Sequence, residues 1–483
     1  MSRAMISHRL ACLTATALLA GCAVGPNYQR PSAPVTPRFK EADGWRPSDP
    51  ADAIDKGAWW SMFNDPVLNG LERRVATSNQ TVKQFEAAYR QAHAIVAEAR
   101  SQFFPTVSGA VDLTRSHNVG SGSAANRPTG TSVGSSGTST TSVGELEATW
   151  APDLWGRVRR TVEGQKAAAQ ESAADLANAR LSAQATLAQD YFALRVLDEE
   201  AELFRQTVTG FQQYLQLTQL QFKEGTQPYS AVIAAKTQLL GAQSSLIAVG
   251  STRAQMEHAV AVLTGTPPAL LSIAPAPVTR AVPIPPAGLP STLLERRPDV
   301  ASAERKVASA NAQIGVAISA YFPDLTLSGE YGGSASNLAD LFKSATSLWS
   351  LGADVSETLL DFGARRAQVA EARAGYDEAV ASYRQTVLTA FQGVEDELAA
   401  LRILQEQEAV LLQAEAAARQ TVQLDLLEYR EGTVDYTTVI TAQATSLSTS
   451  VNVLTVLQQR LQASVLLVED LGGGWSAADL PKS

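Results

Sequence analysis

The residue types that most often carry catalysis or bind metals are few in this sequence and widely separated. Of its four histidines, one lies near the N-terminus, and the other three occupy unrelated segments: His93, His117 and His258. None of them has the spacing of metal ligands. The chain also contains no zinc-protease helix motif, nucleophile elbow, phosphate loop or dinucleotide-binding loop. We therefore expect no enzyme, no metal site and no cofactor, and any energy for transport would come from a partner.

Cys22 is the one residue whose surroundings predict a covalent reaction. It follows Leu19-Ala20-Gly21 at the end of an apolar run that begins at Leu10. The run is too short to span a bilayer as a helix and is typical of a secretory signal. The stretch resembles the lipobox of bacterial lipoproteins, in which the cysteine thiol carries diacylglycerol and the new N-terminus an acyl chain.

This resemblance implies that residues 1–21 are removed as a signal peptide and that residues 22–64 form a lipidated tether. Two or more acyl chains anchor a protein stably, because each buried methylene contributes about 0.8 kcal/mol. Ala23 stands where an Asp favours inner-membrane retention of lipoproteins, so we expect the outer membrane. The alternative is an ordinary signal peptide that happens to contain a cysteine. Cys12 lies within the signal, so a chain acylated at Cys22 would have no disulfide.

The elements that must carry any function come in two copies. Lys-Glu-Gly-Thr-Gln-Pro-Tyr-Ser at residues 223–230 returns as Arg-Glu-Gly-Thr-Val-Asp-Tyr-Thr at residues 430–437, and the two glycines are 432 − 225 = 207 residues apart. Ala193–Leu197 returns at Ala400–Leu404, and 400 − 193 is again 207. A turn that matched by chance would not bring a similar upstream sequence with it. The chain is therefore an internal duplication.

Each copy is predicted to contain a helix, two strands, a long helix, a turn and a return helix. Proline-rich residues 266–290 would form an extended belt between the copies, and residues 472–483 a tail. In the first long helix, apolar residues recur at steps of three and four from Leu194 to Phe222, as in a coiled coil. The first copy spans residues 65–265, with strands at about 103–115 and 143–153 and a turn at 223–229. The second copy spans residues 291–471, with strands at about 323–333 and 348–360 and a turn at 430–436.

The strands and the long helices together predict a channel made of several copies. Strands of roughly 9–11 residues suit a tilted crossing of an outer membrane, but an open strand edge finds no hydrogen-bond partner in lipid. Three copies would supply 4 × 3 = 12 strands, whereas the eight of a dimer usually enclose no open channel; a tetramer is not excluded. The helix from Arg157 to Gly225 would be ~100 Å long, which is about three times the hydrocarbon core, so it must extend into water.

A series of short stretches, in a fixed order along the chain, matches the pattern of a known family. The stretches are Gly21–Tyr28, Trp59-Trp60, Phe63–Leu68, Leu294–Val300, Ala303-Glu304, Ile314-Gly315 and Phe322-Pro323. Taken together they resemble the TolC-like outer membrane factor family, specifically the lipoprotein branch of resistance-nodulation-division multidrug efflux systems. The resemblance implies a mixed, mainly α fold in which a homotrimer joins a 12-stranded transmembrane β-barrel to a periplasmic α-barrel of coiled-coil hairpins. It also implies a passive exit duct for drugs or other small toxic compounds, acting with a periplasmic adaptor (membrane fusion) protein and an inner-membrane pump.

The resemblance also assigns roles to the two repeated turns, as hairpin tips at the periplasmic mouth. Contacts with the adaptor would involve Gly225, Thr226, Tyr229, Gly432, Thr433 and Tyr436. The mouth is closed at rest in relatives, and the candidate gate residues here are Tyr429, Asp435 and Thr441. Thr441 stands where some relatives carry an Asp, so Asp435 is the candidate substitute for an acidic ring. The alternative is that the turns only cap their helices and that Asp435 is merely solvated.

Two other functions stay open at this point. A duct for type I protein secretion would use the same channel for another cargo, and a lipid-anchored coiled-coil scaffold would have no pore. A net charge of −9 without a dense Lys/Arg cluster argues against a nucleic-acid partner. Arg296 and Arg297 precede Pro298 and Asp299, which suit a helix start, so we expect these arginines to pair locally and not to bind a ligand.

Overall fold

The computed structural model describes residues 23–42, 58–118, 137–283, 285, 295–341 and 343–481. They form two compact units. One unit combines the start of the chain up to Gln29 with Ala92–Ala168 and Val307–Ala379, and the other contains the remaining segments. Each unit therefore takes material from both sequence repeats. The duplication did not produce two consecutive domains; corresponding pieces of the two copies are packed together.

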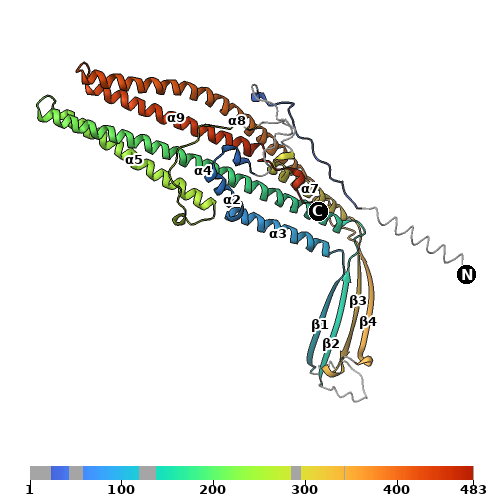
Figure 1. The fold of residues 1–483 in the computed structure, drawn as a ribbon. Helices are drawn as coiled ribbons and strands as arrows, with labels where there is room; N and C mark the ends of the chain where they lie inside the picture. Colours follow the sequence, from blue (N-terminus) through green and yellow to red (C-terminus); the bar gives the residue numbers. More distant parts are fainter. Residues whose placement is uncertain are drawn as a thin grey trace, which may run out of the picture. The chain divides into compact units, whose positions relative to one another are not determined.

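The first unit contains one antiparallel sheet with the strand order β1-β2-β3-β4 (Figure 1). The strands are β1 (Thr106–Asn118), β2 (Gly137–Trp150), β3 (Asp324–Ala335) and β4 (Ser347–Ser356). All four lie where strands were expected, but β2 begins at Gly137, before the expected start at about residue 143. Its added part is held by polar cross-strand pairs, Ser116 with Ser139 at 2.9 Å and His117 with Thr138 at 2.9 Å. An alternation of apolar residues cannot reveal such pairs.

One face of this sheet is apolar and exposed in the single chain. Successive side chains of a strand point to opposite faces, so alternate positions of all four strands share this face. The paired registers bring Leu146 opposite Tyr331, and Tyr331 opposite Trp349. Its exposed large residues are Val107, Val111, Leu113, Leu146, Trp150, Tyr331, Trp349, Leu351 and Val355. A face of this kind suits a hydrocarbon environment.

Seven longer helices complete the described chain: α2 (Pro66–Ser78), α3 (Gln80–Ser101), α4 (Arg157–Lys223), α5 (Tyr229–Leu263), α7 (Pro298–Ser319), α8 (Ala364–Arg430) and α9 (Tyr436–Asp470). A single helix was expected before the first strand of the first copy, and this was wrong. Asn79 has an extended backbone between α2 and α3. Its side chain donates to the Leu263 carbonyl at 2.8 Å and accepts from the Val82 amide at 3.0 Å. These bonds cap α3 and hold it beside the end of α5.

The duplication is visible in the helix lengths. Helices α4 and α8 have 67 residues each, and α5 and α9 have 35 each. Figure 1 shows α4 with α5, and α8 with α9, as two long helical hairpins. By length and composition alone, α5 and α9 could each cross a membrane. More than half of the apolar window of α9 is buried within the chain, which accounts for its apolar residues by packing.

The segment expected to be a tether is packed against the helices at several described positions. Trp59, in a short 3-10 helix, is 1% exposed and belongs to the core formed with Tyr191 and Phe192 of α4 and Leu461 of α9. Phe39 is buried against Val394 and Leu398 of α8. In the described residues, the region between 23 and 64 is therefore bound to the fold and not a free linker.

The proline-rich belt contains no helix or strand in its described part after residue 270. Its backbone is bound by charged side chains of α4 and α5. Arg195 donates to the Ala274 carbonyl at 2.7 Å, Arg253 donates to the Ile273 carbonyl at 2.6 Å, and Asp198 accepts from the Ala276 amide at 3.1 Å. Charged partners replace the ladder bonds that a strand would have had.

The pairing expected for Arg297 is confirmed. Its guanidinium contacts the carboxylates of Asp299 and Asp470, each at 2.7 Å, and α7 begins at Pro298. These two carboxylates keep the pKa of Arg297 above its usual value despite burial, which opposes the shift. The arginine connects the start of α7 to the end of α9 and has a structural role.

Candidate functional site at the two hairpin turns

The repeated turns have the same backbone conformation. In the first, the amide of Thr226 donates to the Gln221 carbonyl at 2.9 Å and the amide of Gly225 to the Phe222 carbonyl at 3.0 Å. In the second, Thr433 donates to Glu428 at 3.0 Å and Gly432 to Tyr429 at 3.1 Å. Each donor and acceptor of the second turn lies 207 residues after its counterpart. The six-to-one bond from the threonine amide, with a glycine directly before that threonine, is the Schellman ending of a helix.

The residue types in the turns follow from that geometry. Gly225 and Gly432 both have a φ of +76°, a left-handed conformation that costs other residues about 1–2 kcal/mol. The hydroxyls of Thr226 and Thr433 donate a second bond to the same carbonyls as their amides, each at 2.9 Å. The glycines and threonines therefore cap the helices, and the threonine hydroxyls are used in doing so.

Three tyrosines connect the two hairpins close to the turns. Tyr214 of α4 stacks nearly parallel to Tyr436 at the start of α9, with an angle of 10° between the ring planes. Tyr429 of α8 stands edge-on to both rings, with centroids 5.4 Å from Tyr436 and 6.2 Å from Tyr214. Its hydroxyl also donates to Oε1 of Gln221 in α4 at 3.1 Å. We call these four residues the inter-hairpin cluster.

The inter-hairpin cluster is partly buried and carries no charged side chain. Burial raises the pKa of the Tyr214 and Tyr436 phenols above the usual value for tyrosine, so both stay protonated at neutral pH. The Tyr436 hydroxyl is buried and has no hydrogen-bond partner among the described residues. The cluster therefore contains a hydrogen bond from Tyr429 to Gln221 and a buried hydroxyl, that of Tyr436, that donates to no described residue.

The two tips differ in what their aromatic residues contact. Tyr229 and Phe222 occupy the positions 207 residues before Tyr436 and Tyr429, and their ring centroids are 5.3 Å apart. The Tyr229 side chain is 60% exposed in the single chain, whereas Tyr436 is half-buried. The first tip thus presents an aromatic pair to the surroundings, and the second tip uses the equivalent pair to hold the first hairpin.

The structure brings together only some of the residues predicted for the mouth. Tyr429 and Tyr436 are in contact, but Asp435 is exposed, and its side chain makes no capping bond at the start of α9. Thr441 is exposed, and its hydroxyl donates to the Thr437 carbonyl within α9 at 2.9 Å. Among the residues that the structure describes, no group of histidines, cysteines and carboxylates could hold a metal ion.

Sequence reasoning missed two members of the inter-hairpin cluster, Tyr214 and Gln221. Both lie on the first long helix but outside its apolar stripe, so the coiled-coil pattern gave them no role. A weak signal was present. Tyr214 is a large aromatic residue off the stripe, within three turns of a predicted tip, and such a side chain has to be covered by something other than its own return helix.

A second part of the site lies at the start of the described chain. Cys22 itself lies outside the described residues, but the segment that follows it is firmly bound. Arg160 of α4 is 3% exposed and donates to the carbonyls of Val24 and Gly25 at 3.1 Å and to the Asn27 side chain at 2.9 Å. The amide of Val24 donates to the Trp155 carbonyl at 3.0 Å, just beyond the end of β2. The position next to the predicted lipid anchor is thus fixed at the ends of the strands.

Comparison with known proteins agrees with this architecture. The chain matches the family model described as outer membrane efflux protein over residues 72–266 and 289–473, which correspond to the two repeats. It is 29% identical over 466 residues to the probable efflux pump outer membrane protein TtgC of Pseudomonas putida, covering 95% of this chain and 94% of that protein. It is 30% identical over 482 residues to the solvent efflux pump outer membrane protein SrpC of Pseudomonas putida, covering 95% and 97%. Among solved structures it resembles the outer-membrane channel OprN, with a TM-score of 0.83, 28% identity and coverage of 94% and 100%.

Proposed function

The chain belongs to the outer membrane efflux protein family, and from this premise we propose that it is the homotrimeric exit duct of a tripartite efflux system. Membership of the family makes it an outer membrane component of an efflux pump. The proposal adds the number of copies, the contacts with an adaptor and an inner-membrane resistance-nodulation-division pump, the gate and the lipid anchor.

The observation that carries the proposal is the open four-stranded sheet. In the described chain, β1 and β4 are each paired on one side only. Their outer edges cannot face lipid, because backbone groups there would lack hydrogen-bond partners. The exposed apolar face of the sheet suits the lipid side of a barrel. Closure by further copies removes both edges, and three copies give 3 × 4 = 12 strands and an aqueous interior.

The two hairpins would form the periplasmic mouth and meet the adaptor. Three copies present six nearly equivalent tips, because the two turns of one chain have the same conformation. Of the residues assigned to the contact, Tyr229 offers an exposed ring, whereas Tyr436 is engaged in the inter-hairpin cluster. The backbone at Gly225, Thr226, Gly432 and Thr433 would shape the contact surface, and their helix-capping role fixes that shape.

The inter-hairpin cluster would hold the mouth in its resting state. Tyr429 contacts the other hairpin through both its ring and its hydroxyl. Asp435 and Thr441 are exposed and would line the mouth, where Asp435 supplies a carboxylate from each copy. An adaptor opens such a gate only if it binds the open arrangement more tightly than the closed one.

The lipid anchor would be attached at Cys22, at the periplasmic rim of the barrel. Arg160 and the Trp155 carbonyl bind the segment immediately after this cysteine, next to the end of β2. Acyl chains at this level reach the inner leaflet of the outer membrane without a long linker. Cys22→Ser should abolish the acyl mass in intact-protein mass spectrometry, and an unmodified wild-type Cys22 would end this part of the proposal.

The channel is tested with the purified full-length protein in detergent and in planar bilayers. Native mass spectrometry should give three copies, and bilayers should show conductance steps. A stable monomer without conductance would overturn the proposal. The cargo is tested by deleting the gene: increased susceptibility to organic solvents and antibiotics supports efflux of small toxic compounds, whereas unchanged susceptibility with a lost secreted protein supports type I secretion.

A further inference from the structure

The internal duplication provides a template for contacts that a single chain cannot show. In the first hairpin of strands Thr106 pairs with Thr149, and in the second Asp324 pairs with Ser356. The strand pairs are related by fixed shifts, since 106 + 218 = 324 and 149 + 207 = 356. The register of the first hairpin is therefore preserved residue by residue in the second. Contacts made by repeat one with repeat two can be translated by the same two shifts.

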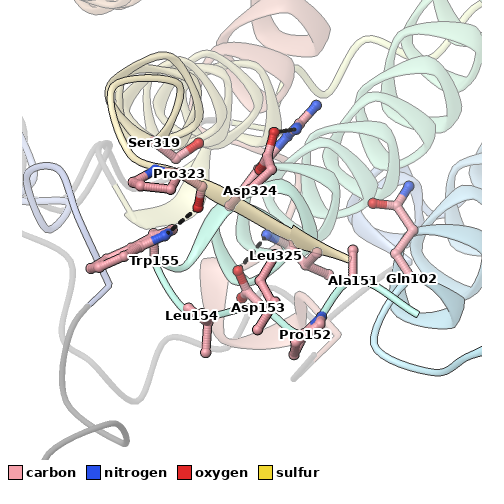
Figure 2. A pocket seen from close by; sticks show the side chains of 12 residues that line it. Gln102, Ala151, Pro152, Asp153, Leu154, Trp155, Ser319, Pro323, Asp324 and Leu325 are labelled. Atoms are coloured by element: carbon pink, nitrogen blue, oxygen red, sulfur yellow. Dashed lines mark hydrogen bonds and ion pairs between the residues drawn. The ribbon is translucent and has the colours of Figure 1, made fainter. Parts of the chain in front are cut away.

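The junction from repeat one to repeat two lies within the chain and has two features. The strands β2 and β3 pair with Ala148 opposite Gly329. Beyond them, Trp155 stacks on Phe322, with centroids 4.8 Å apart and an angle of 22° between the planes. The Trp155 Nε1 donates to the Pro323 carbonyl at 2.8 Å, and Figure 2 shows this bond beside a cavity of about 270 Å³.

The equivalent residues at the two open edges of the sheet are aromatic and exposed. Phe362 lies at 155 + 207, and its side chain is 93% exposed; Phe104 lies at 322 − 218, and its side chain is 70% exposed. Phe362 also has a φ of +51°, which is rare for a bulky residue and costs of order 1–3 kcal/mol. A strained phenylalanine that is so exposed gains little from contacts with the described part of its own chain to offset that cost.

We infer that the junction between repeats recurs between copies: β4 of one copy pairs with β1 of the next, and Phe362 stacks on Phe104 of that next copy. The register follows from the template. Ala148 opposite Gly329 translates to 148 + 207 = 355 and 329 − 218 = 111, so Val355 lies opposite Val111 of the next copy. The inference rests on the proposed closed oligomer and specifies how its wall is joined.

The face pattern of the strands supports this register independently. Val355 and Val111 both belong to the exposed apolar face, so the pairing continues that face across the boundary between copies. A shift by one residue would place the polar face of one copy beside the apolar face of the other. A shift by two would keep the faces but separate Phe362 from Phe104 by two further residues along the strands, about 7 Å, and lose the stack.

The space beside Phe362 is also open to a second copy of the chain. At the junction within the chain, the segment after Cys22 covers Gly156, where an added Cβ would lie 2.7 Å from the Ala23 Cα. At the equivalent Gly363, an added Cβ would meet no described atom within 4 Å. The chain's own N-terminal segment covers only one of the two equivalent junctions, so Phe362 is left for the next copy.

The register is tested by cysteine pairs in the full-length protein, whose two natural cysteines lie in the signal peptide and at the predicted lipid site. Val111→Cys with Val355→Cys should form covalent dimers and trimers on mild oxidation, since directly opposite Cβ atoms are ~5 Å apart. Two pairs serve as controls and should give none. Asp112→Cys with Val355→Cys places the thiols on opposite faces, and Arg115→Cys with Val355→Cys separates them by about 13 Å along the strand.

The outcomes separate this inference from the proposed function. If native mass spectrometry still gives a conducting oligomer but the Val111–Val355 pair does not cross-link, the register is wrong while the channel stands. If no oligomer forms with the unsubstituted chain, both fail. For the aromatic contact, Phe362→Ala should lower the temperature at which the oligomer dissociates on gels, and Phe362→Trp, the residue found at position 155, should restore it. An unchanged dissociation temperature in Phe362→Ala would overturn the stacking.

Discussion

The Tyr429 hydroxyl donates to Oε1 of Gln221 across 3.1 Å and thereby joins the end of α8 to the last turns of α4. These residues come from different repeats. Tyr429 also contacts the stacked rings of Tyr214 and Tyr436, so one side chain makes polar and apolar contacts between the hairpins. The tips of the two hairpins are therefore held together by a small number of contacts that can be removed one at a time.

Tyr429→Phe should increase the open fraction of the channel. The change removes one hydrogen bond that contributes about 0.5–1.5 kcal/mol, which corresponds to a roughly 2- to 10-fold shift towards the open state. Single-channel recordings in planar bilayers measure it. Tyr229→Phe is the matched control, because it also removes a phenol hydroxyl, from a ring that is largely exposed in the first tip. Equal open fractions in the two variants would contradict a latch at Tyr429.

Tyr436→Phe should have the opposite effect. The Tyr436 hydroxyl is buried without a partner among the described residues, and leaving such a group unpaired costs about 1–3 kcal/mol. Removing it keeps the stack on Tyr214 and relieves the cost, so the closed tips become more stable. Hydrogen exchange of the amides in residues 223–229 and 430–436 should slow down. Faster exchange would show that the hydroxyl has a partner in the assembled channel.

Replacing the turn glycines by alanine should loosen the tips. Gly225→Ala and Gly432→Ala meet no steric obstacle but must adopt a φ of +76°, at a cost of about 1–2 kcal/mol each. Gly241→Ala in the middle of α5 also meets open space and should instead stabilise the helix by about 1 kcal/mol. The unfolding temperature, measured by circular dichroism, should therefore fall in Gly225→Ala and Gly432→Ala and rise in Gly241→Ala. A common direction would argue against conformational control of the turns.

Because of the buried Glu72 of α2, we predict that the folded protein loses stability as the pH rises. Its side chain is fully buried, both carboxylate oxygens lack partners among the described residues, and burial raises its pKa from 4.5 to about 9. The folded state holds the proton more tightly, so the contribution of Glu72 to stability is fully present below pH 4.5 and is lost as the pH rises towards 9. At pH 7 the loss is about (7 − 4.5) × 1.36, or roughly 3 kcal/mol.

Glu72→Gln should remove that dependence, because the amide is neutral at every pH. The unfolding temperature of the helical signal, measured between pH 5 and pH 9, should decline less in the variant than in the wild type. Glu224→Gln, at an exposed position in the first turn, is the control and should leave the decline unchanged. A decline that is the same with and without Glu72 would mean that another group binds the proton.

Local sequence patterns determined most of the elements of this protein. Sequence patterns located four strands, the 207-residue repeat located both turns, and apolar residues at steps of three and four marked the first long helix. These features can be recognised in the sequence without knowledge of the fold. The break at Asn79 and the early start of β2 were missed, because a side-chain cap with Leu263 and polar pairs across strands involve partners that no local pattern contains.

Tertiary structure alone decided how the equivalent residues came to differ. Tyr229 and Tyr436 occupy the same place in the same turn, yet one is exposed and the other is stacked on Tyr214. Trp155 and Phe362 are likewise equivalent, yet Trp155 stacks on an aromatic residue of its own chain whereas Phe362 is almost fully exposed. The physical reason is that a chain with two repeats contains one junction between repeats, from β2 to β3. The residues equivalent to that junction lie at the two open edges of the sheet, beside β1 and β4. Which of two equivalent residues is covered depends on the neighbours that the fold places beside it, and the similar sequences of the two repeats do not distinguish them.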